Sequence, residues 1–424
     1  MSILVPRNRR FLTTAAFYSP LGTLKRRFAS YTAAPALRCD IDAEPLHRYR
    51  PGGYHPVHLG DSFKNGRYKI LHKIGWGGYS TTWVARDLLM SRNVAVKFSV
   101  SEKNDNHETH ILQAISAFRG DHPGRAHLVQ MLDCFIVDGP NGTHDCLVLE
   151  LLGPSVQDAI TSYKDHRLPA ALAKSTAYQA LQGLDLLSQH KISHADFHSG
   201  NVAFKLPDLD LLDEHQFFKK YGKPEISGVH STDGAVATIH VPSYIVQPIS
   251  LTGRAMRDSL SKLSVAKLID FGESFFEGQS PAKIHTPLPV RAPEALFGDN
   301  LDCHVDIWSM GCLLFELVTG QPPFDSVMIT PAILVSQMIE FSTDKLPGRW
   351  QEKWQAMAKT VSENDTPYTL QRWMEEIYFD DDKHAEFTNK DITKICELVG
   401  RMLIFEPSTR PPANEILQDP WFKS

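Results

Sequence analysis

The spacing of hydrophobic residues changes near residue 150. Before that point apolar residues are dense and bounded by turn residues, a pattern that predicts strands at 67–74, 81–86, 93–100 and 146–152. A turn with three glycines, at 75–80, separates the first two strands. One helix is predicted at 107–118, because Ile111, Leu112 and Ile115 share a helical face. The first part of the chain is therefore expected to be a small β-rich unit with one helix.

Beyond Gly153 the pattern becomes helical. Alanine, leucine and other apolar residues recur at helical spacing and predict helices at 168–190, 305–319 and 390–404. The stretch between 201 and 269 is instead rich in proline, aspartate, serine and glycine. It is long for a connection within a compact unit, so we expect a surface insert at about 206–264.

These elements belong to a chain of 424 residues, of which 42% are hydrophobic and 22% are charged. That composition excludes a disordered chain, a collagen and a small disulfide-rich scaffold. No stretch approaches the roughly 20 unbroken apolar residues of a membrane helix, so we expect no membrane partner. The six cysteines lie far apart without a Cys-x-x-Cys pair, which fits a reducing compartment.

Charge is distributed unevenly along the chain. Residues 1–38 contain seven lysines and arginines and no acid, although the whole chain has a formal charge of −5. The rest is acidic, so we expect no direct binding to nucleic acid. Residues 1–45 resemble a mitochondrial presequence, but a disordered basic tail or a mis-assigned start codon would give the same composition. We expect a cytoplasmic or nuclear protein, with the mitochondrion as the alternative.

The first candidate for chemistry is the glycine turn with the strand that follows it. Glycines let backbone N–H groups approach phosphate oxygens without obstruction by a Cβ atom. Lys97 ends an otherwise apolar run, and a buried ammonium group needs an acidic partner, for which Glu108 on the predicted helix is well placed. Each feature alone would equally fit a structural turn and a surface lysine.

Two later segments supply oxygen ligands and a proton acceptor. One reads Ser-His-Ala-Asp-Phe-His-Ser-Gly-Asn at 193–201, and the other is Asp-Phe-Gly at 270–272. Phosphoryl transfer needs oxygen ligands for Mg²⁺ and an acceptor for the hydroxyl proton. A lone aspartate more often caps a turn or helix. Asp196, Asn201 and Asp270, in this order behind a glycine turn, favour catalysis instead.

Taken together, these motifs resemble those of eukaryotic protein kinases over about residues 54–423. The resemblance implies an α+β fold with two lobes, an antiparallel β-rich lobe at 54–152 and a larger, mainly helical lobe at 153–424. ATP and Mg²⁺ would lie in the cleft between the lobes. Arg291-Ala-Pro-Glu294 matches the motif that closes the activation segment, and Arg410 matches the arginine that pairs with Glu294.

The resemblance also implies roles for individual residues. Lys97 and Glu108 would anchor the phosphates, and Asp196 would be the catalytic base. Asn201 and Asp270 would be the magnesium ligands. The implied nucleotide site comprises Ile74, Gly75, Trp76, Gly77, Gly78, Tyr79, Ser80, Ala95, Lys97, Leu149, Glu150 and Leu152.

Within the kinases, the chain resembles the SR-protein kinases of fungal type. The matching segments are Tyr-His-Pro-Val at 54–57, the run from Ile74 to Trp83, and Glu-Leu-Leu-Gly-Pro-Ser at 150–155. This resemblance implies a monomeric, non-specific serine/threonine protein kinase whose substrates are Arg/Ser-rich proteins such as RNA-processing factors. That family binds arginine-rich substrates in an acidic groove built partly from the segment that matches 322–330 here, which contains one acid, Asp325. Other acids are present at Glu375, Glu376, 380–382 and 208–214, but such runs are more often solvated surface, so we expect a weaker preference for Arg–Ser repeats.

The sequence departs from the kinase pattern at several positions. Ala195 replaces the arginine that usually precedes the catalytic aspartate, and such a chain lacks the usual partner for an activating phosphate. We therefore expect activity without phosphorylation of the activation segment. His198 stands where a lysine usually steadies the transferred phosphoryl group, and it is expected to be mostly neutral at pH 7. Pro287 takes the usual place of a threonine, with Thr286 one position out of register.

Two alternative functions remain open from the sequence. The string His-Ala-Asp-Phe-His-Ser-Gly-Asn at 194–201 also resembles the loop of aminoglycoside and choline kinases, which act on small molecules. The segments around Glu294 and Arg410 argue against that class. The other alternative is a pseudokinase that binds nucleotide as a scaffold, and among the catalytic positions only His198 favours it.

Overall fold

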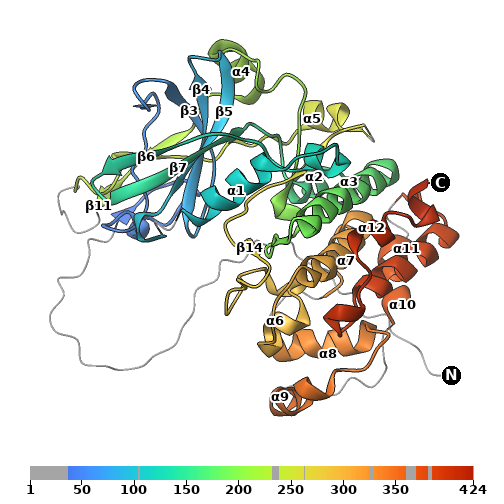
Figure 1. The fold of residues 1–424 in the computed structure, drawn as a ribbon. Coiled ribbons are helices and arrows are strands. Elements are labelled where there is room, and N and C mark those ends of the chain that lie inside the picture. The colour runs from blue at the N-terminus through green and yellow to red at the C-terminus, as the bar shows by residue number, and fades with distance from the viewer. Residues whose placement is uncertain are drawn as a thin grey trace, which may run out of the picture.

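The computed structural model describes residues 37–103, 106–231, 238–261, 263–324, 329–359, 369–380 and 384–423. Its first lobe contains a six-stranded antiparallel sheet with the order β2-β3-β4-β5-β7-β6. The strands are β2 (Ser62–Phe63), β3 (Tyr68–Gly77), β4 (Ser80–Asp87), β5 (Arg92–Ser99), β6 (Met131–Gly139) and β7 (Gly142–Glu150). Helix α1 (His107–Ala117) lies beside this sheet, on the side of the second lobe (Figure 1).

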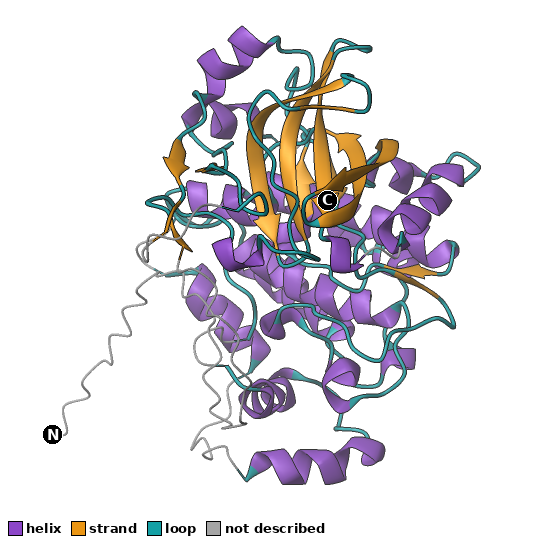
Figure 2. Cartoon of the chain, turned by 90° about the vertical axis from the view of Figure 1, so that its left-hand side faces the viewer, coloured by secondary structure: helices purple, strands orange, loops and turns teal. Residues whose placement is uncertain are grey.

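The second lobe is mainly helical (Figure 2). At its centre lies α7 (His304–Thr319), in which every residue from Val305 to Thr319 is buried. The other helices are α2 (Val156–Ser162), α3 (Ala170–Gln189), α6 (Pro293–Phe297), α8 (Pro331–Phe341), α9 (Gly348–Ala358), α10 (Leu370–Tyr378), α11 (Asn389–Met402) and α12 (Ala413–Ile416). One large apolar cluster runs from Leu71 and Ala95 of the first lobe into this helical core. The predicted α+β fold, with an antiparallel β-rich lobe and a larger, mainly helical lobe, is confirmed.

The predicted elements are present, and two details differ. The turn expected at 75–80 is shorter, because Gly75 and Trp76 extend β3 and pair with Thr82 and Thr81 of β4. Only residues 78 and 79 form the turn. Strand β6 was not predicted: it lies at the edge of the sheet, and its residues are half-buried or exposed, so burial imposes little apolar pattern on it.

The segment expected to be a surface insert is partly buried. It starts and ends on two paired strands, β9 (Val202–Phe204) and β13 (Ala266–Leu268). Between them lie α4 (Glu214–Tyr221), β10 (Ile226–Gly228), β11 (His230–Ser231), β12 (Tyr244–Val246) and α5 (Arg254–Ser259). Ile245 and Val246 are each 1% exposed, and Val246 belongs to the apolar cluster of the first lobe. The insert is therefore part of that lobe's core.

Part of the expected N-terminal extension belongs to the folded body. Strand β1 (Leu37–Arg38) pairs with β11 of the insert, and the buried carboxylate of Glu44 forms an ion pair with Lys73 of β3. The prediction of disorder is thus wrong for residues 37–45, a targeting role stays a prediction, and residues 1–36 lie outside the described residues. Among the helices that the structure describes, none is long and apolar enough to cross a membrane.

Candidate active site

A cavity of about 310 Å³ lies between the two lobes. Its lining brings together most of the predicted catalytic and phosphate-binding residues: Gly77, Gly78, Tyr79, Ser80, Lys97, Glu108, Asp196, His198, Asn201 and Asp270. Other predicted residues do not line it: Ile74, Gly75, Trp76, Ala95, Leu149, Glu150 and Leu152.

The residues outside this cavity lie on β3, on β5, on β7 and just after β7. Ala95 and Leu149 face each other across β5 and β7, and both belong to the apolar cluster that joins the lobes. The carboxylate of Glu150 accepts a hydrogen bond of 2.6 Å from Lys267.

Two strand pairs bring the catalytic residues together from distant segments. Residues 194–201 form the loop between β8 (Ile192–Ser193) and β9, and Asp270 lies between β13 and β14 (Phe275–Phe276). Strand β8 pairs with β14, and β9 pairs with β13. Because both ends of the loop are hydrogen-bonded to both ends of the Asp270 segment, Asp196 and Asn201 must lie near Asp270.

Lys97 holds two carboxylates at one side of the cavity. Its Nζ lies 2.8 Å from both carboxylate oxygens of Glu108 and 2.9 Å from Oδ1 of Asp270. Burial alone would lower the pKa of Lys97, but the charges of Asp270 and Glu108 raise it. The same ammonium group lowers the pKa of Asp270 to about 2. One cation thus serves two anions, and the excess negative charge suits a bound cation.

Helix α7 fixes the catalytic loop, residues 194–201, through hydrogen bonds from its first turn. The buried carboxylate of Asp306, in the first turn of α7, accepts hydrogen bonds of 2.7 Å from the His194 N–H and 2.8 Å from the Ala195 N–H. Ala195 has a φ of +64°, a left-handed conformation that is strained for a residue with a Cβ atom. Asp306 stabilises this strained turn and so sets the direction of Asp196.

Asp196 has one engaged and one unpaired oxygen. Asn201 Nδ2 donates to Oδ2 at 3.2 Å and to the Asp196 carbonyl at 2.8 Å. Oδ1 is buried and has no hydrogen-bond partner among the described residues. Burial, together with the charges of Asp270 and Glu273, raises the pKa of Asp196 to about 6. A carboxylate of this kind can accept a proton from a hydroxyl group near neutral pH.

His198 lies next to this unpaired oxygen. Its Nδ1 accepts a hydrogen bond of 3.1 Å from the Gly200 N–H, and its Nε2 lies 3.8 Å from Asp196 Oδ1. Burial lowers the pKa of His198 to about 4. The imidazole is therefore neutral at pH 7. Because Nδ1 accepts, the proton is assigned to Nε2, which makes that atom a donor facing the cavity.

Several residues that line the cavity next to the Asp-Phe-Gly segment were not predicted from the sequence. Lys103 Nζ donates to the Gly272 carbonyl at 3.3 Å, and His107 Nε2 lies 2.5 Å from the Ser274 carbonyl. His285 Nδ1 lies 2.9 Å from Glu273 Oε2. The only sequence signal for Lys103 and His107 is their position just before and at the start of the predicted helix 107–118.

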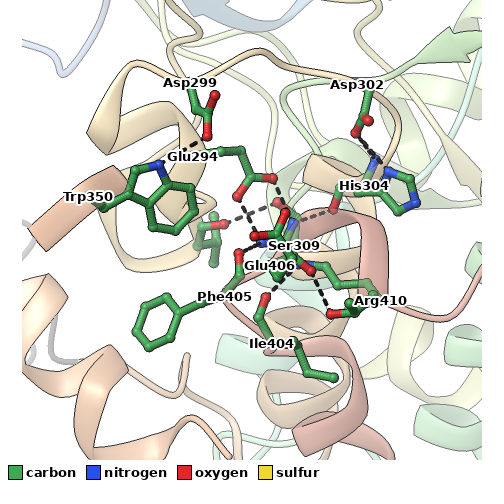
Figure 3. A network of polar contacts seen from close by, with 12 residues as sticks. Glu294, Asp299, Asp302, His304, Ser309, Trp350, Ile404, Phe405, Glu406 and Arg410 are labelled. Atoms are coloured by element: carbon green, nitrogen blue, oxygen red, sulfur yellow. Dashed lines mark hydrogen bonds and ion pairs between the residues drawn. The ribbon is translucent and has the colours of Figure 1, made fainter. Parts of the chain in front are cut away.

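The predicted pair of Glu294 and Arg410 is confirmed (Figure 3). The two side chains form a double hydrogen bond of 2.6 and 2.8 Å and are at most 1% exposed. Arg410 also donates to the carbonyls of His304, Ile404 and Phe405. The pair thus ties α6, at the end of the activation segment, to the start of α7 and to the C-terminal segment.

One cluster outside the cavity has the composition of a metal site. Ligand atoms of Asp302, Cys303 and His304 lie within 4.8 Å of one another. Asp302 Oδ1 already accepts from the backbone N–H of His304 at 2.9 Å and lies 2.8 Å from its Nδ1. Ser188 donates to the sulfur of Cys303. These hydrogen bonds account for the cluster as a cap at the start of α7.

Comparison with known proteins agrees with this geometry. The family model described as the protein kinase domain matches residues 68–213 and 258–422. The chain is 29% identical over 401 residues to the serine/threonine-protein kinase SRPK of Physarum polycephalum, covering 90% of this chain and 92% of that protein. It is 26% identical over 467 residues to protein kinase dsk1 of Schizosaccharomyces pombe, covering 90% and 85%. With human SRSF protein kinase 3 the identity is 37% over 174 residues, covering 40% and 30%.

Proposed function

The chain belongs to the protein kinase family, and from that premise we propose that it transfers the γ-phosphoryl group of ATP to serine or threonine hydroxyl groups of proteins. Its similarity to serine/threonine kinases over 90% of its length supports this activity. The observation that carries the proposal is the meeting of Lys97, Glu108, Asp270 and Asp196 at one cavity. More specifically, we propose that the enzyme is a non-specific serine/threonine protein kinase.

Each catalytic residue has a separate task in the proposed reaction. Asp196 orients the substrate hydroxyl and accepts its proton as the hydroxyl oxygen bonds to phosphorus. The bond between the γ-phosphorus and the bridging oxygen breaks, and ADP leaves with that electron pair. Lys97, held by Glu108, fixes the phosphates, and the Nε2–H of His198 faces the transferred group. Catalysis rests on positioning and charge neutralisation, with no covalent intermediate on the enzyme.

The residues present fit a magnesium ion. Carboxylate and amide oxygens are the ligands that Mg²⁺ prefers, and Asp270 and Asn201 offer them at the same cavity. The excess of negative charge around Lys97 also favours a divalent cation there. We propose that Asp270 and Asn201 hold Mg²⁺, which would neutralise charge on the phosphates.

A transfer assay with radiolabelled ATP and a Ser-containing peptide tests this function. We expect the unaltered chain to phosphorylate the peptide and the Asp196→Ala and Asp270→Ala variants to lose turnover while remaining folded. Each of these changes removes a charged group at the cavity without removing apolar core packing. Retained turnover in the Asp270→Ala variant would refute its assignment.

Two further results of the same assay would replace the proposed function. Nucleotide binding without any transfer would indicate a pseudokinase, the alternative that His198 favours. Transfer to a small-molecule alcohol, with none to peptides, would indicate a small-molecule kinase. The buried Glu294–Arg410 pair, which organises the end of the activation segment, favours a protein substrate over a small molecule.

A further inference from the structure

Two side chains from outside the cavity hold the tip of the glycine turn. Arg48 Nη2 donates to the Gly78 carbonyl at 2.5 Å, and the Tyr54 hydroxyl donates to the Gly77 carbonyl at 2.6 Å. Both side chains precede residue 68, where the match to the protein kinase domain begins. They come from residues 44–54, which we name the brace.

The backbone of the brace is folded so that these two side chains lie together. The Tyr54 N–H donates to the Arg48 carbonyl at 3.0 Å, and the Gly53 N–H donates to the Arg50 carbonyl at 2.8 Å. A Cβ atom at Gly53 would lie 1.8 Å from the Arg48 carbonyl oxygen, so this loop requires glycine there. The Arg48 guanidinium lies 5.4 Å from the centre of the Tyr54 ring.

The brace is anchored to the sheet beneath it. Glu102, just after β5, forms ion pairs with Arg48 at 3.2 Å and Arg50 at 3.3 Å. Its backbone N–H also donates to the Gly52 carbonyl at 2.7 Å. Further along, the buried carboxylate of Glu44 is paired with Lys73 and accepts from the Tyr49 hydroxyl. These contacts fix the brace at both ends.

The insert completes the anchoring from the opposite side. Ile245 of β12 packs with Tyr49, Tyr54 and Val100 in a small apolar cluster that is separate from the two larger ones. Asn141 Nδ2 donates both to the Tyr54 carbonyl at 2.6 Å and to the His240 carbonyl of the insert at 2.8 Å. The brace therefore lies between the sheet and the insert.

We propose that Arg48 and Tyr54 are positioning residues that hold the glycine turn for binding the phosphates of ATP, an inference that rests on the proposed function. The carbonyls of Gly77 and Gly78 belong to the same peptide groups as the N–H groups of Gly78 and Tyr79. Fixing the carbonyls fixes the direction of those N–H groups, which belong to residues that line the cavity. A hydrogen bond to a carbonyl also polarises its peptide group and strengthens the N–H as a donor.

The test compares two variants of the brace with two matched controls in the full chain. Tyr54→Phe removes one hydroxyl, and its control Tyr68→Phe removes a hydroxyl bonded to Asp133 at 2.6 Å, at the opposite end of β3 from the glycine turn. Arg48→Ala removes one guanidinium, and its control Arg50→Ala removes another that also binds Glu102 but does not contact the turn.

Affinities for magnesium-ATP and for adenosine are measured by titration calorimetry, and amide exchange is followed in residues 75–82.

We expect Tyr54→Phe and Arg48→Ala each to weaken ATP binding roughly fivefold, the loss of about one hydrogen bond. Adenosine has no phosphates, so its affinity should be unchanged, and amide exchange at 75–82 should become faster. Both control variants should have the same ATP affinity, adenosine affinity and amide exchange as the unaltered chain. If the brace had a purely structural role, the two variants would weaken the binding of ATP and of adenosine alike.

Three results would overturn the proposal. They are ATP affinities equal to those of the controls, equal weakening of ATP and adenosine, and unchanged exchange at 75–82 in both brace variants. A chain that binds ATP but phosphorylates no peptide would contradict the proposed function alone. In that case the comparison of ATP with adenosine would still decide the role of Arg48 and Tyr54.

Discussion

The imidazole Nε2 of His198 lies 3.8 Å from Oδ1 of Asp196, and this oxygen has no hydrogen-bond partner among the described residues. Burial lowers the pKa of His198 to about 4, so the group that faces the proposed base is neutral. In the described part of the chain Asp196 thus has no cation at hydrogen-bonding distance, and burial with the charges of Asp270 and Glu273 raises its pKa to about 6. The combination makes the catalytic loop sensitive to pH.

We expect the kcat/KM for ATP to rise as the pH increases through about 6. Asp196 must be deprotonated to accept the hydroxyl proton, and in the free enzyme it loses its proton near that pH. The measurement is a pH–rate profile between about pH 5 and 8.5 at a peptide concentration far below its KM, so that the profile reports the free enzyme. A profile that stays flat down to pH 5, as an aspartate with the ordinary pKa of about 3.9 would give, would contradict this assignment.

His198→Lys should shift this acidic limb to lower pH. An ammonium group beside Asp196 favours the charged carboxylate and so lowers its pKa. His198→Gln keeps a neutral N–H donor, and we expect its limb to stay near that of the unaltered chain. The two pH–rate profiles, measured side by side, separate the effect of charge from that of shape. Equal shifts in both variants would show that the charge at residue 198 does not determine the pH of the acidic limb.

The sequence predicts those parts of the site that depend on short-range patterns. Lys97 and Glu108 are 11 residues apart on adjacent elements, and their ion pair follows from a buried lysine that needs a partner. The position of Tyr54 is different, because its contact with Ile245 joins segments that no local pattern relates. His198 is expected from its ordinary pKa to be mostly neutral at pH 7, but the further lowering of that pKa by burial and the hydrogen bond from the Gly200 N–H arise only in the folded loop.

Which of the predicted residues line the cavity could likewise not be predicted from the sequence. Ile74, Ala95 and Leu149 were predicted as part of one site with the glycine turn, but they pack with the apolar cluster that joins the lobes. Their apolar character fits a nucleotide wall and a core equally well. The assignment of these residues to the nucleotide site therefore stays a prediction.

Arg410→Ala should destabilise the helical lobe strongly. It leaves the Glu294 carboxylate, 1% exposed, buried without its partner, and such losses cost about 3–5 kcal/mol. The matched control is Arg372→Ala, which breaks an exposed pair with Glu376 and should cost about 0.5 kcal/mol or less. Urea unfolding measures both free energies. Similar losses in the two variants would show that burial of the Glu294 pair does not matter.

Activity should persist after phosphatase treatment. Thr286 is buried, and its hydroxyl donates to the Ala195 carbonyl at 2.5 Å, so it is poorly placed to receive a phosphate. Arg291 is already bound to the Thr286 carbonyl. Lys103 and His107 hold the start of the activation segment without a phosphate.

The measurement for this prediction is peptide phosphorylation before and after the treatment, with mass spectrometry of residues 273–290. His107→Ala should lower the activity because it frees the Ser274 carbonyl. Loss of activity on dephosphorylation, mapped to that segment, would contradict the expectation.

The last prediction concerns the substrate: we expect phosphorylation of serine and threonine peptides with only a moderate preference for Arg–Ser repeats. Several acids of the kind that binds arginines are already engaged within the chain. Glu376 pairs with Arg372 at 2.9 Å, Glu214 pairs with Lys69 at 2.9 Å, and Asp213 caps the start of α4. Asp325, 381 and 382 lie outside the described residues. The remaining attraction is between solvent-exposed acids of the chain and the arginines of the peptide, and salt screens such charges. Raising the salt concentration should therefore reduce the preference for Arg–Ser peptides without abolishing activity. A peptide array at low and high salt measures both effects, and an absolute requirement for Arg–Ser dipeptides would show that the engaged acids still form a binding groove.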